Sequence, residues 1–320
     1  MARLALGIDL GGTNVRAALV APDTGRIVAA RKAALADRAP EAVAAAAAQA
    51  AREAAAAAGV EPAALGGAGV GVAGQCLGSS GVVLNAPNLG WRDVPFGAML
   101  EHALGLPARV ANDLSAAAWG ELRFGAARGF SEVLVVFAGS GVGAGLVTGG
   151  RLLEGGRGVA GEIGHVRVPS PRGRAPRRCG CGQTGCLEAW AGGMNLSARV
   201  REDLQAGAVT AVREVVGGDL ARVGPSAVEE AFARGDGYAR DLWEEIGELL
   251  GTAVANAATL LNPERLILGG GVLTGCPGLA AAVRRSFDAA ISPSAAVGLS
   301  VAEAALGDDA GLVGAALLER

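Results

Sequence analysis

The strongest constraint in this chain is a pair of segments in which one apolar run leads into a glycine-rich turn and another apolar run follows. The first segment covers residues 4–20, and the second covers residues 133–147. Glycines between apolar runs predict two β-hairpins, and the backbone N–H groups of such turns can approach a phosphate closely. The layout is repeated although the residues differ. We therefore expect two related lobes that present their turns to a shared ligand.

Strand-like and helical patterns follow one another along the rest of the chain. We expect buried strands at residues 68–73, 108–111 and 266–268, and a loop that includes residues 85–91. We expect helices at residues 37–59, 96–104, 114–124 and 310–318, a mainly helical stretch at 190–262, and a further helix after Pro277.

Glycine and lysine have unusual frequencies. Glycine accounts for 52 of 320 residues, roughly twice the usual share of about 7%, and we attribute the glycines outside the motifs below to a composition rich in alanine and arginine. Lys32 is the only lysine, and neither a P-loop nor a protein-kinase pattern surrounds it. We therefore expect phosphate to be held by backbone N–H groups and a metal ion.

Charge and hydropathy exclude other classes of protein. The formal net charge is −3, which argues against a nucleic-acid partner, and we expect the arginine-rich residues 172–178 to form a solvated loop. The longest apolar runs are shorter than the roughly 20 residues that span a bilayer, and the first residues do not resemble a signal peptide. The cysteine spacing is not that of a disulfide framework. We expect a cytoplasmic protein without a membrane partner.

Three cysteines, Cys179, Cys181 and Cys186, lie close together among glycines. Thiolates at this spacing can wrap a tetrahedral ion, and a closed zinc site needs a fourth protein ligand. His165 and His102 are the two histidines, and His165 is the nearer one in sequence. A loop of free thiols is the alternative. The pattern favours a structural Cys₃His zinc site.

Polar residues next to apolar runs are candidates for catalysis and sugar binding. Asp113 follows Asn112 at the end of a short apolar run, so its carboxylate is a candidate general base for a hydroxyl that attacks phosphorus. Glu162, His165 and Glu188 flank the cysteine loop and could hydrogen-bond several sugar hydroxyls. As single residues, each has a simpler explanation as a surface or capping residue.

The glycine turns carry further candidates. Asp9 precedes the first turn, where a carboxylate can hold Mg²⁺ through water. Residues 269–271 are three consecutive glycines after a buried strand, which suits a backbone that lies flat against a ring or a ribose. The alternative readings are ordinary tight hairpins and a crowded strand-to-helix turn.

Together these motifs resemble the ROK family (repressors, open reading frames and sugar kinases), and specifically its bacterial glucokinase type. The resemblance covers the whole chain and rests on residues 9–14, Asn112-Asp113, residues 139–145, Glu162-Ile163-Gly164-His165, residues 179–188 and residues 269–271. The C-x-C-G-x-x-G-C-x-E run combined with G-E-x-G-H is highly specific. The glycine turns support it.

The resemblance implies an α/β, actin-like (ribonuclease H-like) two-domain ATPase fold with a zinc-binding loop. Residues 1–113 plus 305–320 would form a small domain and residues 114–304 a large one, with the active site in the cleft between them. The implied activity is ATP-dependent phosphorylation of the 6-hydroxyl of D-glucose, with Asp113 as general base and with Mg²⁺ and structural Zn²⁺ bound.

The resemblance also assigns the site residues. The sugar would contact Gly74, Asn88, Asn112, Asp113, Glu162, His165 and Glu188. ATP and Mg²⁺ would contact Asp9, Gly11, Gly12, Thr13, Asn14, Gly139, Ser140, Gly141, Gly143, Gly269, Gly270 and Gly271. Zinc would be bound by His165, Cys179, Cys181 and Cys186.

The sequence leaves the substrate and the assembly open. Ala73, Ser140 and Ala144 depart from the family's usual proline, threonine and glycine, and the segment between His165 and Cys179 is longer than usual. N-acetylmannosamine, N-acetylglucosamine, fructose or allose could replace glucose, and polyphosphate could replace ATP. Family members are commonly homodimers or tetramers.

A protein that senses sugar without phosphorylating it is the alternative from another class. ROK repressors carry a winged helix-turn-helix before the first phosphate turn, and the eight residues before Asp9 leave no room for one. We therefore expect an enzyme.

Overall fold

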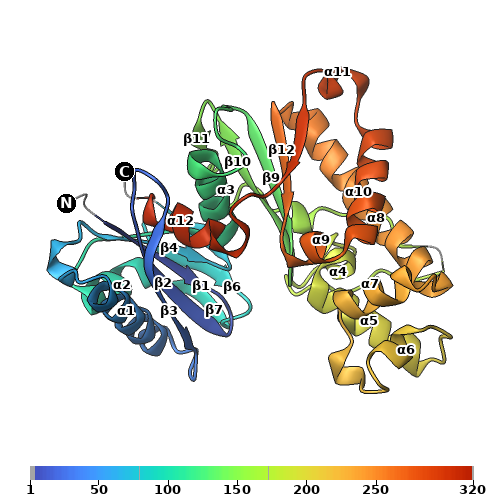
Figure 1. The fold of residues 1–320 in the computed structure, drawn as a ribbon, viewed down its shortest axis with the longest axis horizontal. Helices are drawn as coiled ribbons and strands as arrows, with labels where there is room; N and C mark the ends of the chain where they lie inside the picture. Colours follow the sequence, from blue (N-terminus) through green and yellow to red (C-terminus); the bar gives the residue numbers. More distant parts are fainter. Residues whose placement is uncertain (1–3, 79, 172, 319–320) are drawn as a thin grey trace. The chain divides into compact units, whose positions relative to one another are not determined.

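The computed structural model describes residues 4–78, 80–171 and 173–318, which form two compact units (Figure 1). Unit 1 comprises Met1–Val133, Gly145–Gly161 and Ala304–Arg320, and unit 2 comprises Leu134–Ala144 and Glu162–Glu303. This division differs from the expected boundary after residue 113. Helix α3 (Asp113–Phe124) packs along α12 (Ala310–Ala316), so it belongs to unit 1 together with the C-terminal segment.

The first sheet brings together segments that are far apart in sequence. Its strands are β1 (Ala5–Leu10), β2 (Asn14–Val20), β3 (Ile27–Ala34), β4 (Ala68–Val72) and β8 (Ala108–Asn112), in the order β3-β2-β1-β4-β8. The antiparallel pairing of β1 with β2 confirms the first predicted hairpin. β1, β4 and β8 run parallel, with nearly every β1 and β4 residue buried.

A second five-stranded sheet has the same order of strands. It consists of β9 (Val133–Ala138), β10 (Val142–Thr148), β11 (Arg151–Leu152), β12 (Arg265–Gly269) and β13 (Ser300–Glu303), in the order β11-β10-β9-β12-β13. In both sheets the first strand is central, the second and third follow on one side, and the fourth and fifth follow on the other. This repetition agrees with the two related lobes predicted from the hairpins.

A third, three-stranded sheet was not predicted. It contains β5 (Gln75–Leu77), β6 (Val82–Ala86) and β7 (Trp91–Val94). The prediction of a loop at residues 85–91 was therefore wrong at both ends, because β6 includes residues 85 and 86 and β7 begins at residue 91. Antiparallel pairing of β6 with β7 places Ala86 opposite Trp91 and encloses the turn between them. The Trp91 ring is buried, and its centroid lies 4.9 Å from that of Phe96. Packing of Trp91 against Phe96 therefore stabilises β7, a strand that the sequence analysis did not predict.

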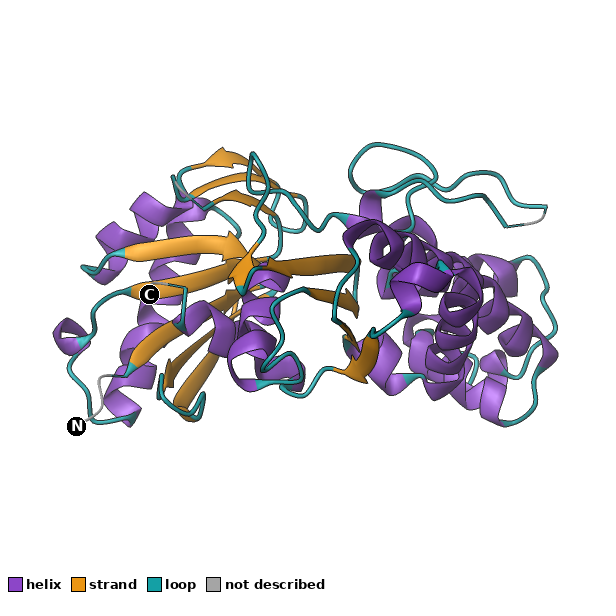
Figure 2. Ribbon diagram, turned by 90° about the horizontal axis from the view of Figure 1, so that it is seen from above, coloured by secondary structure: helices purple, strands orange, loops and turns teal. Residues whose placement is uncertain are grey.

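Helices form mainly where the sequence predicted them. Besides α3 and α12 they are α1 (Pro40–Ala57), α2 (Phe96–Leu104), α4 (Glu188–Ala191), α5 (Gly193–Gln205), α6 (Val212–Val215), α7 (Pro225–Ala233), α8 (Gly237–Leu261), α9 (Gly271–Gly275), α10 (Pro277–Ala290) and α11 (Pro293–Ala296). In Figure 2 these helices are purple and the strands orange, and residues 188–261, all of them described, contain no strand. Among the described residues, no helix combines the length and the low polarity that crossing a bilayer requires.

Close backbone packing around α12 accounts for several glycines that we had attributed to composition. A Cβ atom at Gly7 of β1 or at Gly69 of β4 would overlap carbonyl oxygens of α12. A Cβ atom at Gly314 of α12 would overlap the carbonyl oxygen of Ala116 in α3. That part of the earlier interpretation was wrong, because these glycines permit helix and sheet backbones to touch.

We expect Gly314→Ala to destabilise the protein by at least about 2 kcal/mol, because the added methyl group forces α3 and α12 apart. Equilibrium urea unfolding measures the change. Gly156→Ala is the matched control, since a Cβ atom there meets nothing within 4 Å. Its effect is expected to stay within about 0.5 kcal/mol. Equal stability of the two variants would contradict this account of α12.

Candidate functional site

The carboxyl ends of three parallel strands in unit 1 lie side by side. Leu10 of β1 is paired with Val72 of β4, and Val72 is paired with Asn112 of β8. The residues that follow these strand ends, including Gly74 and Asp113, therefore gather at one edge of the sheet. In open α/β sheets this edge is where ligands bind.

The side chain of Asn112 has a structural role that the sequence analysis missed. Its Oδ1 accepts hydrogen bonds from the backbone N–H groups of Leu114 (2.9 Å) and Ser115 (3.1 Å), so Asn112 caps α3. Its Nδ2 donates to the carbonyl of Gly74 at 3.0 Å. These bonds hold Asp113 at the first position of α3 and tie it to the end of β4. An asparagine directly before a helical pattern was the signal for this cap.

The first glycine turn lies against the loop that carries Asn88. A Cβ atom at Gly12 would lie 2.7 Å from the Cβ atom of Asn88, and one at Gly74 would lie 2.7 Å from the carbonyl oxygen of Asn85. Only glycine fits these two positions without displacement of the backbone. Unit 1 therefore brings Gly12 next to Asn88, and Gly74 next to Asn85 and Asn112.

Asp9 lies near the end of β1, close to several charged groups. Burial raises the pKa of its carboxyl, the nearby Arg16 lowers it, and Asp308 raises it further. Arg16 itself donates to the carbonyl of Asp308 at 2.7 Å and to Oδ1 of Asp309 at 2.6 Å. A largely buried carboxylate beside a glycine turn can bind a hydrated divalent cation.

The second glycine turn is held by the start of α5 in unit 2. The backbone N–H of Gly193 donates to the carbonyl of Gly139 (2.9 Å), and that of Met194 donates to the carbonyl of Ser140 (3.1 Å). Gly143 lies within β10 instead of in the turn. Gly270 has a φ of 88°, and a Cβ atom there would overlap the carbonyl oxygen of Ala138, so the three-glycine segment packs directly against this turn.

A cavity of about 390 Å³ begins next to the three-glycine segment. It is lined mainly by apolar residues of β12, α9, α10 and β13, with Arg284 and Glu303 as its charged lining residues. Leu268 immediately precedes the three glycines, and Thr274 lies in the helix that follows them. A mostly apolar cavity with few polar groups suits a flat, largely apolar ring.

Glu188 joins the second glycine turn to the cysteine loop. Its Oε2 accepts a hydrogen bond from the backbone N–H of Val142 at 3.0 Å. Its Oε1 lies 4.0 Å from Sγ of Cys179. On the other side of the cysteines, Nε2 of His165 lies 3.4 Å from Oε2 of Glu162. Of the three residues predicted as sugar ligands in this unit, His165 therefore belongs to the cysteine cluster, Glu188 approaches Cys179, and Glu162 approaches His165.

The four predicted zinc ligands form a compact cluster. One ligand atom from each of His165, Cys179, Cys181 and Cys186 lies within 4.8 Å of all the others. The Sγ atoms of Cys181 and Cys186 are 3.7 Å apart, and Nδ1 of His165 is 3.6 Å from Sγ of Cys179. A tetrahedral zinc with Zn–S bonds of about 2.3 Å requires S–S separations of about 3.8 Å, so this donor set fits zinc.

Proton release accompanies metal binding at such a cluster. Burial raises the pKa of the Cys179 thiol to about 12, and it raises the pKa of Cys186 as well. A bound cation has to displace these protons, because thiolates are the metal ligands.

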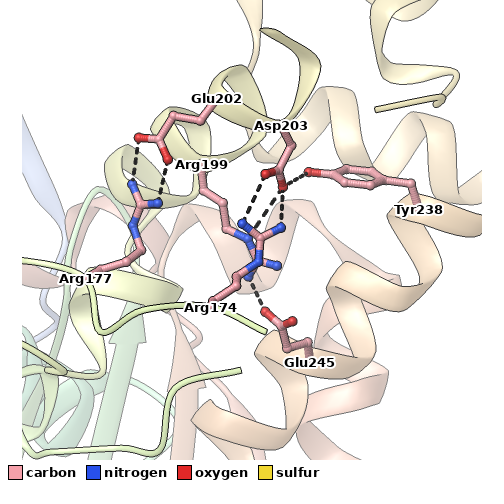
Figure 3. A network of polar contacts seen from close by, with 7 residues as sticks. All are labelled: Arg174, Arg177, Arg199, Glu202, Asp203, Tyr238 and Glu245. Atoms are coloured by element: carbon pink, nitrogen blue, oxygen red, sulfur yellow. Dashed lines mark hydrogen bonds and ion pairs between the residues drawn. The ribbon is translucent and has the colours of Figure 1, made fainter. Parts of the chain in front are cut away.

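The arginine-rich loop is not merely solvated, which corrects the sequence analysis. Figure 3 shows Arg174 and Arg177 directed toward acidic residues of α5. Arg174 makes two hydrogen bonds to Asp203 (3.0 and 2.7 Å), and Arg177 makes two to Glu202 (2.7 and 3.0 Å). Arg172 lies outside the described residues. The acids occupy the predicted helical stretch, and their distance in sequence hid the pairing.

Asp203 is the centre of this network. Tyr238 Oη donates to its Oδ2 at 2.8 Å, and Arg199, which also pairs with Glu245, lies 3.8 Å away (Figure 3). Burial raises the pKa of Asp203, but hydrogen bonds from Arg174 and Tyr238 outweigh it and leave the pKa below its ordinary value. The network fixes the loop between His165 and Cys179 to α5 and α8.

Comparison with known proteins agrees with this geometry. The model of the ROK family matches residues 5–320. A glucokinase of Streptomyces coelicolor is 35% identical over 323 residues, covering 99% of this chain and 98% of the relative. A glucokinase of Halalkalibacterium halodurans is 37% identical over 235 residues, covering 72% of this chain and 69% of the relative.

A solved structure is similar over the same length. The crystal structure of a ROK family glucokinase from Streptomyces griseus, in complex with glucose and AMPPNP, has a TM-score of 0.82 and 36% identity, with 98% of both chains covered. The repeated sheet order and these relatives define an actin-like (ribonuclease H-like) α/β fold, as expected. The chain belongs to the ROK family.

The Asp203 network makes stability depend on pH. A carboxyl whose pKa is depressed in the folded state stabilises it fully above the unfolded pKa of about 3.9, and this contribution disappears as the pH falls through the folded-state pKa. We expect Asp203→Asn to lower the free energy of unfolding by about 2 kcal/mol at pH 7 and by progressively less below about pH 4. Urea unfolding at several pH values measures the difference.

Arg174→Ala provides the matched test of this network. Arg174 is the ion-pair partner of Asp203. The double variant is therefore expected to lose less free energy of unfolding than the sum of the losses in the two single variants. If Asp203→Asn lowered the free energy of unfolding equally at pH 7 and pH 3.5, the depressed pKa of Asp203 would be contradicted.

Proposed function

We propose that this protein is an ATP-dependent glucokinase that transfers the γ-phosphoryl group of ATP to the 6-hydroxyl of D-glucose. The observation that carries the proposal is that Asp113 follows β8 at the same edge of the sheet as the first glycine turn, which follows β1. Family membership and the printed names of the relatives, including the complex with glucose and AMPPNP, support it.

In this proposal unit 1 supplies the base and one phosphate turn. Gly11, Gly12, Thr13 and Asn14 form the turn that contacts phosphate oxygens, and the N–H of Gly11 closes this turn by donating to the carbonyl of Asn14 at 3.0 Å. Asp9 holds Mg²⁺, which neutralises phosphate charge when it is bound. Gly74, Asn88 and Asn112 contact the sugar. The cap of α3 keeps the Asp113 carboxylate in place, so little reorganisation precedes proton transfer.

Unit 2 supplies the other phosphate turn, the nucleoside site and the remaining sugar ligands. Gly139, Ser140, Gly141 and Gly143 contact phosphates, and Gly269, Gly270 and Gly271 contact the nucleoside. The cavity beside the three glycines has enough volume for the adenine ring. Glu162, His165 and Glu188 accept and donate hydrogen bonds to the sugar hydroxyls.

In the proposed chemical step, one bond to the γ-phosphorus forms as another breaks. The 6-oxygen of glucose forms a bond to the γ-phosphorus while the bond from that phosphorus to the β,γ-bridging oxygen breaks. The proton of the 6-hydroxyl passes to the carboxylate of Asp113, and ADP leaves with the electron pair of the broken bond. The backbone N–H groups of both turns stabilise the charge on the transferred group.

Zinc in this proposal is structural. His165, Cys179, Cys181 and Cys186 would hold it as a closed four-ligand site, and it would supply rigidity to the loop that carries the sugar ligands. Nδ1 of His165 lies 3.6 Å from Sγ of Cys179, whereas Nε2 lies 3.4 Å from Oε2 of Glu162, so metal and sugar would use different ring nitrogens.

We expect about one zinc ion per chain, because the donor set is that of a closed site. Cys181→Ser is expected to lose most of the zinc and to lower the temperature of unfolding. Metal analysis by mass spectrometry and thermal unfolding measure the two effects. Cys276→Ser, at a buried cysteine outside the cluster, is expected to keep its zinc. Purified protein without zinc would refute the site.

We expect Asp113→Asn to reduce kcat at least about 100-fold while the affinity for glucose stays nearly unchanged, because the amide cannot accept the proton. A coupled assay of ADP release measures kcat, and calorimetry measures sugar binding. Turnover close to that of the wild type would overturn the role of Asp113.

The same assay tests the substrate. Glucose is compared with N-acetylmannosamine, N-acetylglucosamine, fructose and allose, and ATP is compared with GTP and polyphosphate, by kcat/KM. A higher kcat/KM for another sugar would keep the kinase and change its substrate. Sugar binding without ADP release would instead indicate a sensor.

A further inference from the structure

The second glycine turn and a predicted sugar ligand are directly connected. The carboxylate of Glu188 accepts the backbone N–H of Val142, which immediately follows the turn, at 3.0 Å. Glu188 begins α4, and α5 follows it and holds the turn through Gly193 and Met194. The turn is therefore bound to the helices that carry the sugar ligand.

Packing leaves little freedom between the turn and this carboxylate. A Cβ atom at Gly141 would overlap Oε2 of Glu188, and one at Gly164 would overlap the carbonyl oxygen of Val142. By contrast, a Cβ atom at Gly139, in the same turn, meets nothing within 4 Å. The contact with Glu188 is therefore specific to one side of the turn, where the peptide of Val142 is held.

We propose that the Val142 N–H···Glu188 hydrogen bond couples sugar binding to nucleotide binding, with Gly141 and Val142 as positioning residues. This inference rests on the proposed function. A hydrogen bond to a carboxylate is stronger than one between neutral groups, so a sugar that fixes the Glu188 side chain also fixes the peptide of Val142. The turn is then ordered for phosphate before ATP arrives.

Coupling of this kind is reciprocal. If the sugar strengthens nucleotide binding by some factor, the nucleotide strengthens sugar binding by the same factor. A hydrogen bond that merely supports the fold would instead change stability and leave both affinities in place. The two cases therefore differ in binding measurements that involve no catalysis.

Gly141→Ala is the first test. The added methyl group meets only the end of a flexible side chain, so we expect the protein to fold and the carboxylate of Glu188 to move. Calorimetric titration with glucose, once alone and once with saturating AMPPNP, is expected to show that AMPPNP strengthens glucose binding at least about fivefold less than in the wild type. Gly139→Ala is the matched control in the same turn, and the factor by which saturating AMPPNP strengthens its glucose binding is expected to stay within about twofold of the wild-type factor.

Glu188→Gln is the reciprocal test. The amide oxygen is a weaker acceptor than the carboxylate, so AMPPNP titrated without any sugar is expected to bind at least about fivefold more weakly. Glu162→Gln removes the same charge beside His165 and is expected to leave AMPPNP binding within about twofold of the wild type. A role of Glu188 in sugar binding alone would not change nucleotide affinity in the absence of sugar.

The outcomes separate this inference from the proposed function. If AMPPNP strengthened glucose binding equally in Gly141→Ala and Gly139→Ala, the coupling would be overturned, whereas phosphorylation of glucose by the wild type would still stand. Failure of the wild type to bind or phosphorylate any hexose would overturn the proposed function itself. If Gly141→Ala loses its zinc or unfolds, the AMPPNP titrations of Glu188→Gln and Glu162→Gln test the coupling instead. Equal AMPPNP affinities of these two variants would then overturn it.

Discussion

The parallel hydrogen-bond ladder between β1, β4 and β8 is the constraint on which the rest of unit 1 depends. Its register aligns Leu10, Val72 and Asn112, so three segments distant in sequence end at one edge of the sheet. A shift by one residue would turn every side chain of a strand to the opposite face. Burial of nearly all residues of β1 and β4 opposes such a shift, and the Asn112 cap then transmits the alignment to Asp113.

Glycine has two separate functions in this structure. In the turns it allows close packing, as at Gly12 against Asn88 and Gly141 against Glu188, and the turns were predictable because their glycines cluster between apolar runs. Around α12 it allows backbones to touch, as at Gly69 and Gly314, where a Cβ atom would overlap a carbonyl oxygen. These glycines are scattered along the sequence, so their common role is visible only when their segments meet.

Much of the fold and of the candidate site could be predicted, and the exceptions have physical reasons. The hairpin of β1 and β2, the helices α1 and α2, and the cysteine cluster each depend on local patterns. Strands β5, β6 and β7 depend on pairing with one another, which no local pattern encodes. The arginine-rich loop was interpreted as solvated because its acidic partners, Glu202 and Asp203, lie more than twenty residues further along the chain.

The sequence by itself determined the kinds of groups in this protein: two glycine turns, one Cys₃His donor set, and a set of carboxylates that includes Asp113 and Glu188. Spacing along the chain was enough for these, because turns and metal loops are local structures. Only the tertiary structure decided what each group touches, such as the Val142 N–H on Glu188. The physical reason is that hydrogen bonds and close backbone packing depend on distances in space, which strand register and helix docking set.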